Sequence, residues 1–180
     1  MDGQPFVVPT VHARDGERLL VHGSVASRML KNLSNGVSLC VTVTLLDGLV
    51  LARSGFNHSM NYRSVMILGA ARELREPAEK RAALELIVNR VVAGRAAEVR
   101  APNAKELNAT TVLSLPITEA SAKIRRGPPL DEEPDYALPC WAGVLPLQLM
   151  ALAPLPDPRL PAGVAVPAAL AAWSRGGTHR

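Results

Sequence analysis

The amino-acid sequence predicts a mainly β fold, a small antiparallel barrel with helices packed outside it. Three observations carry this prediction: many short segments rich in β-branched residues, Asp-Gly pairs between such segments, and only two clear helical patterns. Short strands joined by tight turns are typical of antiparallel barrels. With 180 residues, of which 48% are hydrophobic and 20% charged, the chain can bury the core of one domain.

The N-terminal part of the chain predicts a β-hairpin. Pro5–Ala13 is an extended run rich in Val and Thr, and Arg18–His22 resumes as a strand after a turn over Arg14–Glu17. An Asp-Gly pair lies at the centre of this turn, and such pairs favour tight hairpin turns because they tolerate positive φ. We therefore expect the two strands to pair antiparallel.

A second pair of strands is expected further along the chain. Val37–Leu46 alternates β-branched residues with Ser, Cys and Thr and is the clearest strand of the sequence. Asp47 and Gly48 mark another tight turn, after which Leu49–Ser54 returns as a strand.

Two segments have helical patterns. Val25–Leu33 carries apolar residues at helical spacing, with Ser24 as the expected N-cap and Gly36 as the expected end. Ala78–Val92 has a longer pattern of the same kind, and Pro77 fits the first helical position because proline lacks the N–H that would be unpaired there.

The rest of the domain is predicted to continue as strands and loops. Tyr62–Leu74 is expected to be a long strand, in which Gly69 indicates a bulge or a close approach of the backbone. The remaining predicted elements are a short helix over Ala104–Ala109, strands over Thr111–Ile117 and Ser121–Arg126, a surface loop over Gly127–Pro139 and an apolar segment over Trp141–Met150. Residues 1–150 are therefore expected to form one domain. Residues 151–180 are expected to form an Ala/Pro-rich tail, disordered past Ser174.

Composition excludes several classes of function. The formal charge of +4 comes from scattered basic residues, which argues against a nucleic-acid partner. No apolar run reaches the roughly 18 residues of a membrane span, and no signal peptide opens the chain. Cys40 and Cys140 lie in apolar surroundings and are expected to be buried thiols of a cytoplasmic protein. The four scattered histidines argue against a zinc site.

The strongest local signal for chemistry is the segment His22–Arg28, at a junction between a strand and a helix. Helix N-termini attract phosphate, Ser24 and Ser27 offer hydroxyl donors, and Arg28 can pair with phosphate oxygens. The alternative is simple helix capping beside a solvated arginine.

A second signal is the polar segment His58–Val65, where a loop enters a strand. Side chains alternate along a strand, so Tyr62 and Ser64 are expected on one face and Arg63 on the other. A heterocyclic ligand could satisfy these polar groups, and a polar edge at a loop mouth is the alternative.

Three other residues are candidates. His12 and His22 lie on the paired strands of the hairpin, where a structural role is the more common one, and Trp141 is one of two tryptophans, for which core packing is the default. The sequence contains no P-loop, no G-x-G-x-x-G and no defensible catalytic triad, so we name no catalytic residue.

Five stretches, in this order and spacing, resemble a known family. They are DGQPFVVPTVHARDGERLLVHGSVASRML, SLCVTVTLLDGLVLARS, HSMNYRSVMILGAARELREPAEK, ASAKIRRGPP and WAGVLPL. The chain resembles the pyridoxamine 5′-phosphate oxidase-like, FMN-binding split-barrel family, in its flavin-nucleotide-binding, nitroimidazole-resistance-type branch. The resemblance covers most of residues 2–147.

The resemblance implies a six-stranded antiparallel split β-barrel with flanking helices, and a homodimer with FMN at the interface. It assigns Ser27 and Arg28 to the grip on the flavin phosphate and Ser64 to an approach to the flavin ring. The full set of residues implied to bind the cofactor is His12, His22, Gly23, Ser24, Ser27, Arg28, Tyr62, Arg63, Ser64 and Trp141.

The sequence also departs from the family pattern. Met29 stands where a basic residue often follows the Ser-Arg pair, and the C-terminal signature of true vitamin B6 oxidases is not evident. The chain starts where family members usually already have a helix and a strand behind them, so either its start is late or the family's first strand is missing.

We therefore expect a cytoplasmic FMN-binding homodimer that oxidises or reduces a small molecule. Two alternatives stay open. One is a non-catalytic module that binds flavin or haem, with His12, His22 or His58 as an iron ligand, and the other is a reductase that uses the deazaflavin F420.

Overall fold

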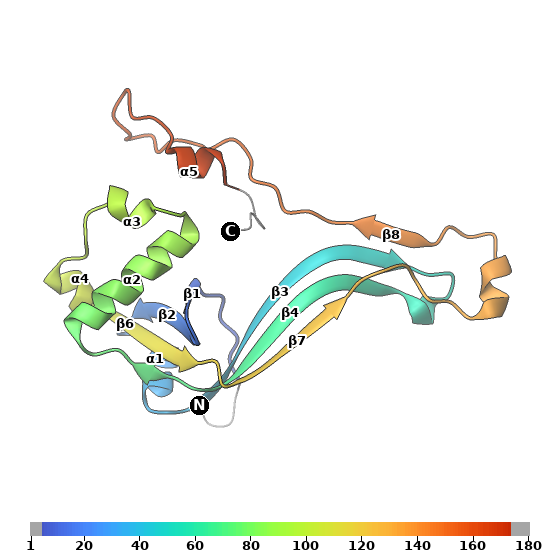
Figure 1. The fold of residues 1–180 in the computed structure, drawn as a ribbon, viewed down its shortest axis with the longest axis horizontal. Helices are drawn as coiled ribbons and strands as arrows, with labels where there is room; N and C mark the ends of the chain where they lie inside the picture. Colours follow the sequence, from blue (N-terminus) through green and yellow to red (C-terminus); the bar gives the residue numbers. More distant parts are fainter. Residues whose placement is uncertain (1–4, 174–180) are drawn as a thin grey trace. The chain divides into compact units, whose positions relative to one another are not determined.

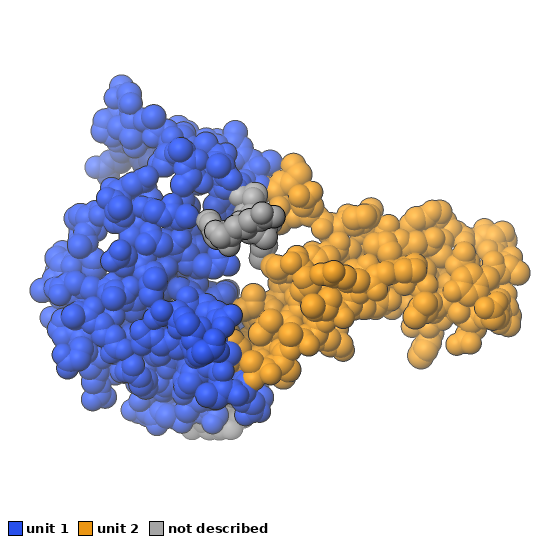
Figure 2. Space-filling view, viewed as in Figure 1, with its two compact units in different colours: residues 1–40, 68–119, 151–180 blue, residues 41–67, 120–150 orange. Residues whose placement is uncertain are grey.

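The computed structural model describes residues 5–173, and the chain divides into two compact units (Figure 2). Unit 1 comprises residues 1–40, 68–119 and 151–180, and unit 2 comprises residues 41–67 and 120–150. The mainly β prediction is confirmed: the strands form two antiparallel four-stranded sheets, neither of which closes into a barrel by itself.

The sheet of unit 1 has the strand order β1-β2-β6-β5 (Figure 1). Its strands are β1 (His12–Asp15), β2 (Arg18–Ser24), β5 (Arg72–Glu73) and β6 (Thr110–Pro116). The predicted hairpin is confirmed, since Asp15 pairs with Arg18 across a two-residue loop in which Gly16 has a φ of 56°. Its first strand begins only at His12.

Helix α2 (Pro77–Val91) covers one face of this sheet. Its buried residues complete a core cluster made of Ala13, Leu20, Leu74, Ala83, Ile87 and Val112. The predicted start at Pro77 is confirmed. Two short helices follow, α3 (Arg95–Glu98) and α4 (Ala104–Asn108), of which α4 was predicted.

Helix α1 (Arg28–Ser34) begins three residues later than predicted. Its N-cap is Ser27, whose Oγ accepts a hydrogen bond from the backbone N–H of Leu30 at 3.4 Å. Ser24, the predicted cap, instead accepts from the N–H of Ala26 at 3.1 Å and forms a turn just before the helix. The prediction of Ser24 as the N-cap was wrong because Ser24 and Ser27 both have hydroxyl side chains that can cap a helix, and both lie close to its start.

The second sheet, in the order β7-β4-β3-β8, lies mainly in unit 2. It consists of β3 (Ser38–Leu51), β4 (Ser59–Ala70), β7 (Glu119–Arg125) and β8 (Gly143–Pro146). Two 3₁₀ helices, η1 (Gly55–Asn57) and η2 (Glu133–Ala137), lie in its connections.

The predicted turn at Asp47 and Gly48 is wrong, because β3 runs through both residues without a break. Gly48 pairs with Pro146 of β8, and a Cβ on this glycine would lie 3.0 Å from the carbonyl oxygen of Leu145. The glycine therefore serves a close approach between strands instead of a reversal of the chain. The reversal comes later, at η1.

The long strand predicted over Tyr62–Leu74 is divided at Ala71 into β4 and β5, which belong to different sheets. The predicted close approach at Gly69 is confirmed. A Cβ there would lie 3.1 Å from Cδ1 of Leu115, and the glycine has a φ of 155°.

The prediction of buried cysteines is also wrong, because both Cys40 and Cys140 are exposed. Cys40 lies on β3, along which exposed and half-buried residues alternate. The Sγ atom of Cys140 lies 4.0 Å from the carbonyl oxygen of Arg53.

After β8 the described chain has little regular structure apart from helix α5 (Ala168–Ala171). The indole N–H of Trp173 donates to the carbonyl of Val91 at 3.3 Å, which ties this segment to α2. The expected disorder past Ser174 concerns residues outside the described part of the chain. Within residues 5–173, no helix has both the length and the apolar character needed to cross a membrane.

Candidate functional site

Six of the predicted cofactor-binding residues lie in unit 1, where β1, β2 and α1 meet. They are His12, His22, Gly23, Ser24, Ser27 and Arg28. The other four, Tyr62, Arg63, Ser64 and Trp141, lie in unit 2.

The two serines of unit 1 use their oxygens in the same way. Ser24 Oγ and Ser27 Oγ each accept from a backbone N–H, so the hydroxyl hydrogen of each remains available as a donor. Since α1 has only seven residues, a bound anion would depend mainly on these hydroxyls and on the neighbouring guanidinium.

Arg28 is exposed, and its guanidinium carbon lies 5.3 Å from the centroid of the Phe6 ring. A cation over an aromatic face gains a modest attraction at an exposed site, on the order of 0.5–1 kcal/mol. A contact with a ring face uses none of the five N–H donors of Arg28, and within residues 5–173 no hydrogen bond from them is found. Sequence reasoning missed Phe6, which no motif distinguished.

Gly23 holds α1 close to β2. A Cβ at this position would lie 2.8 Å from Cδ1 of Leu30, which is buried on α1. A larger residue would force the buried Leu30 side chain to move, so Gly23 lets Leu30 of α1 pack against β2.

The two histidines of the hairpin lie on neighbouring strands but on opposite faces of the sheet. His12 pairs with Val21, so its side chain is on the same face as Val21, and His22 is on the other face. Burial lowers the pKa of both imidazoles below the ordinary value, and the positive charge of Arg90 lowers that of His12 further. The Nδ1 atom of His22 is buried and has no hydrogen-bond partner in the part of the chain that the structure describes.

Two of the three predicted residues on β4 have protein partners, and the third, Tyr62, is half-buried. Ser64 Oγ lies 2.8 Å from Oγ1 of Thr44, and the guanidinium of Arg63 donates from Nε (2.9 Å) and Nη2 (2.8 Å) to the carboxylate of Asp47. These bonds lower the pKa of Asp47 and raise that of Arg63. Arg63 on β4 therefore pairs with Asp47 on the neighbouring strand β3. This agrees with the alternative interpretation of the segment, a polar edge at a loop mouth.

Trp141 is 69% exposed, so core packing, the default for this tryptophan, is wrong. Its ring lies against Gly143, where a Cβ would come within 2.9 Å of Cζ2. The glycine therefore lets the indole lie flat on the backbone with much of its surface open.

A buried ion pair in unit 2 escaped the sequence analysis. The side chain of Asp131 is fully buried and accepts from the Arg53 backbone N–H at 2.9 Å and from Nη1 of Arg53 at 3.1 Å. The guanidinium of Arg53 also lies 4.8 Å from the ring centroid of Tyr136. Asp131 lies in a Pro-rich acidic segment, and nothing in the sequence of this segment indicates that the carboxylate of Asp131 is buried.

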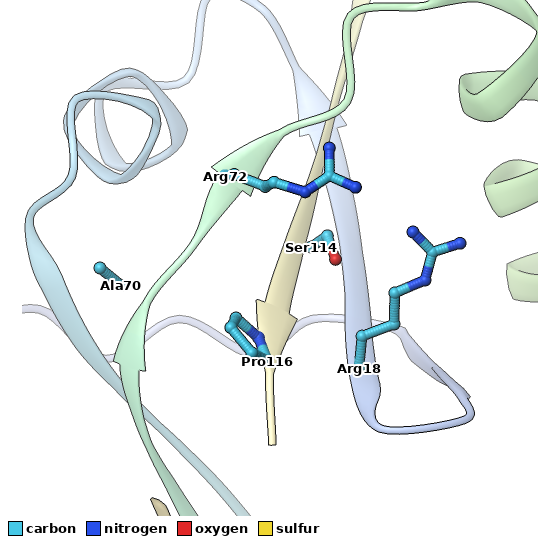
Figure 3. Close-up of a pocket in the computed structure, with 5 residues that line it drawn as sticks. All are labelled: Arg18, Ala70, Arg72, Ser114 and Pro116. Carbon is cyan, nitrogen blue, oxygen red and sulfur yellow. The ribbon is translucent and has the colours of Figure 1, made fainter. Parts of the chain in front are cut away.

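A pocket of about 260 Å³ in unit 1 is lined by Arg18, Ala70, Arg72, Ser114 and Pro116 (Figure 3). Both guanidiniums pair with Glu79 of α2, Arg18 at 3.0 Å and Arg72 at 2.8 Å, and Arg18 also pairs with Asp15. Because the carboxylates balance these cations, the pocket is best explained by the attachment of α2 to the sheet.

Metal ligands are also sparse. Within the described residues, no group of three or more His, Cys, Asp or Glu side chains could hold a metal ion.

Comparison with known proteins gives a family. The family model of pyridoxamine 5′-phosphate oxidase matches residues 1–124. Among proteins with curated functions, none matches this chain.

Two solved structures are similar over almost the whole chain. The flavocytochrome Anf3 from Azotobacter vinelandii is 47% identical, with a TM-score of 0.89, over 95% of this chain and 79% of that one. The FAD and haem binding protein from Mycobacterium smegmatis is 39% identical, with a TM-score of 0.91, over 97% and 85%.

A more distant structure has the same fold. A proposed 5-nitroimidazole antibiotic resistance protein from Bacteroides thetaiotaomicron is 22% identical, with a TM-score of 0.54, over 68% of this chain and 70% of that one.

Proposed function

Because this chain belongs to the pyridoxamine 5′-phosphate oxidase family, we propose that it is a flavin-binding redox protein. One observation carries the proposal: the chain is 47% identical over 95% of its length to a protein named as a flavocytochrome. A second relative, at 39% identity, is named for binding FAD and haem. A bound flavin would supply electron transfer, while the protein binds it and tunes it.

The residues of unit 1 fit the phosphate part of such a cofactor. Ser24 and Ser27 keep hydroxyl donors, and Arg28 keeps its N–H donors on an exposed side chain. In unit 2, the open indole of Trp141 offers an aromatic surface. In unit 1, we propose Ser24, Ser27 and Arg28 as the contacts to the flavin phosphate, supported by His12, His22 and Gly23. In unit 2, we propose Trp141 as the aromatic contact, with Tyr62, Arg63 and Ser64 as the further residues that the family resemblance implies.

FMN is the form of the flavin that the family resemblance implies, and FAD is the form named for the relative from Mycobacterium smegmatis. Denaturation of the purified protein releases a non-covalent flavin, whose mass distinguishes the two. The same measurement would detect F420.

We further propose an oxidoreductase activity on a small molecule and a homodimer as the active form. The support for a second copy is the number of exposed large apolar residues on the strands of the second sheet: Leu46, Leu49, Met60, Val65, Met66, Ile124 and Leu145. Val65 and Met66 are consecutive on β4 and lie on opposite faces, so both faces of this sheet carry exposed apolar side chains. Apolar surface exposed on a folded chain is typical of interaction sites. Light scattering on the purified protein measures its mass in solution.

Haem is a second candidate cofactor, favoured by the names of both similar structures. A bare metal ion needs several protein ligands, which the described residues do not bring together. Haem iron needs only one or two, because the porphyrin supplies the others. The chain's separate imidazoles therefore fit haem better than a bare metal ion.

The test of the proposal is the visible spectrum of the protein as purified, before and after the addition of FMN, FAD or haem. Flavin bands support the flavin proposal and a Soret band supports the haem proposal. A purified protein that shows neither flavin bands nor a Soret band, and that takes up none of the added cofactors, would contradict both proposals.

A further inference from the structure

We propose that His58 is the residue of this chain that ligates haem iron, through its Nε2 atom. The inference rests on the haem binding proposed above. It goes beyond that proposal because it selects one imidazole among the histidines of the chain, from the way the fold holds this side chain.

The hydrogen bond of the His58 ring fixes which nitrogen is open. Nδ1 lies 2.9 Å from the carbonyl oxygen of Ser54. A carbonyl oxygen can only accept, so Nδ1 must carry the hydrogen, and a neutral ring then has its lone pair at Nε2. Histidines that ligate metals nearly always donate their other N–H to a carbonyl or a carboxylate in this manner.

The carbonyl that orients the ring is itself held in place. The backbone N–H of Ser54 donates to Oδ1 of Asp131 at 3.4 Å, and Ser54 Oγ accepts from the N–H of Asn57 at 3.2 Å. Asp131 is fully buried and paired with Arg53. His58 therefore follows a turn that the rest of unit 2 supports, although the imidazole itself is exposed.

The neighbours of His58 offer the apolar surface that a porphyrin needs. Phe56 is 94% exposed and Met60 is 49% exposed, which is unusual for large apolar side chains so close together in sequence. His58 has an extended backbone and leads directly into β4, so alternation places its side chain on the same side as those of Met60 and Tyr62.

The other two described histidines are less suited to bind haem. His22 is on the same sheet face as Leu20, which packs into the core cluster under α2, so a macrocycle there would displace the helix. His12 is half-buried and close enough to Arg90 for that cation to lower its pKa, so a positively charged ferric iron is disfavoured beside it.

The experiment is a titration of the purified full chain with hemin, followed by its absorption and electron paramagnetic resonance spectra. The wild type is expected to take up haem and to show the signature of a histidine ligand. His58→Ala should bind hemin more than about tenfold more weakly, since loss of an outer partner alone typically costs tenfold or more. Added imidazole should restore the wild-type spectrum of this variant.

The control variant His179→Ala changes a histidine that is not among the residues proposed to bind the flavin. This variant should keep the wild-type spectrum, and circular dichroism shows whether each variant folds. A wild type that binds no hemin would overturn the haem proposal, and this inference with it. A wild type that binds hemin, together with a folded His58→Ala variant of unchanged affinity and spectrum, would overturn only the assignment of His58.

Discussion

Arg28 is an exposed side chain that is expected to bind the phosphate of the cofactor. Its nearest aromatic partner is Phe6, and it lies directly after Ser27, whose hydroxyl keeps a donor hydrogen. Among residues 5–173, no carboxylate pairs with this guanidinium, in contrast to Arg63, which donates to both carboxylate oxygens of Asp47. Of the two arginines predicted to bind the cofactor, Arg28 is therefore the better candidate to donate hydrogen bonds to a phosphate.

We predict that Arg28→Ala weakens flavin binding by roughly 1.5–3 kcal/mol, the usual worth of a hydrogen bond to a charged group. At 1.4 kcal/mol for each factor of ten, this is about a 10- to 150-fold rise in Kd. Quenching of flavin fluorescence during a titration measures it. Arg14→Ala is the control, because Arg14 is exposed on the hairpin turn and pairs with Glu17. An equal loss in both variants would remove Arg28 from the site.

Asp47, Gly48 and Asp131 show why some local structure could not be predicted from the sequence. Asp47 and Gly48 have the composition of a tight turn, but the contacts that explain them come from Arg63 of β4 and Pro146 of β8. Asp131 was expected in a surface loop, and only its pairing with Arg53 explains its burial. In each case the deciding partner is distant in sequence, so no local pattern contains it.

At the scale of elements, the helices with local signals were predicted well. Pro77 fits the first turn of α2, and the apolar face of this helix follows the helical period. The hairpin was predicted because its turn contains the Asp-Gly pair. The start of α1 was missed because two serines of similar spacing compete for the cap position.

The packing of α2 gives a matched pair of variants. Ile87 is 3% exposed in the core cluster, whereas its neighbour Leu86 is 38% exposed. We predict that Ile87→Ala lowers the free energy of unfolding by about 2–4 kcal/mol, because it removes buried methyl groups and leaves a cavity. Leu86→Ala should cost less than about 1 kcal/mol. Urea unfolding measures both, and equal costs would contradict the position of α2 on the sheet.

The capping box of α4 predicts a dependence of stability on pH. Glu106 accepts from Nη1 of Arg100 at 2.8 Å and from the N–H of Asn103 at 2.9 Å. Arg100 first, and then Asn103, lower the pKa of Glu106 from 4.5 to about 2. Because the folded state has the lower pKa, the stabilisation is complete above 4.5 and is lost as the pH falls towards about 2.

We therefore predict that Glu106→Gln is less stable than the wild type at neutral pH, and that the difference shrinks as the pH falls from 4.5 towards about 2. Thermal unfolding across this range measures the effect. Asn103→Ala is the control, because it removes a neutral cap and should cost about 0.5–2 kcal/mol at every pH. A difference between Glu106→Gln and the wild type that stays constant with pH would contradict the ion pair.

At the scale of the whole molecule, the sequence predicted the family and the mainly β class, which the family match and the two similar structures confirm. The arrangement of strands into two sheets was not predictable, because the division of one predicted strand at Ala71 depends on which partners each half finds. The residues selected for the cofactor remain predictions, divided between the two units.

The exposed apolar strands of the second sheet predict a second copy of the chain. Ile124 is 59% exposed on β7, an edge strand. We predict that Ile124→Glu shifts the protein from dimer towards monomer in light scattering, because a charge buried in an apolar interface is unfavourable. Leu86→Glu, on the exposed side of α2, should leave the mass unchanged. A dimer that persists in Ile124→Glu would place the interface elsewhere.

Binding of a flavin is the claim on which the account of this molecule depends most. The most direct measurement is the absorption spectrum of the purified chain, combined with the mass of the cofactor released by denaturation. A flavin-binding protein is expected to show flavin bands and to release a molecule with the mass of FMN or FAD. A colourless protein that releases no flavin, and that takes up neither FMN nor FAD when they are added, would contradict it.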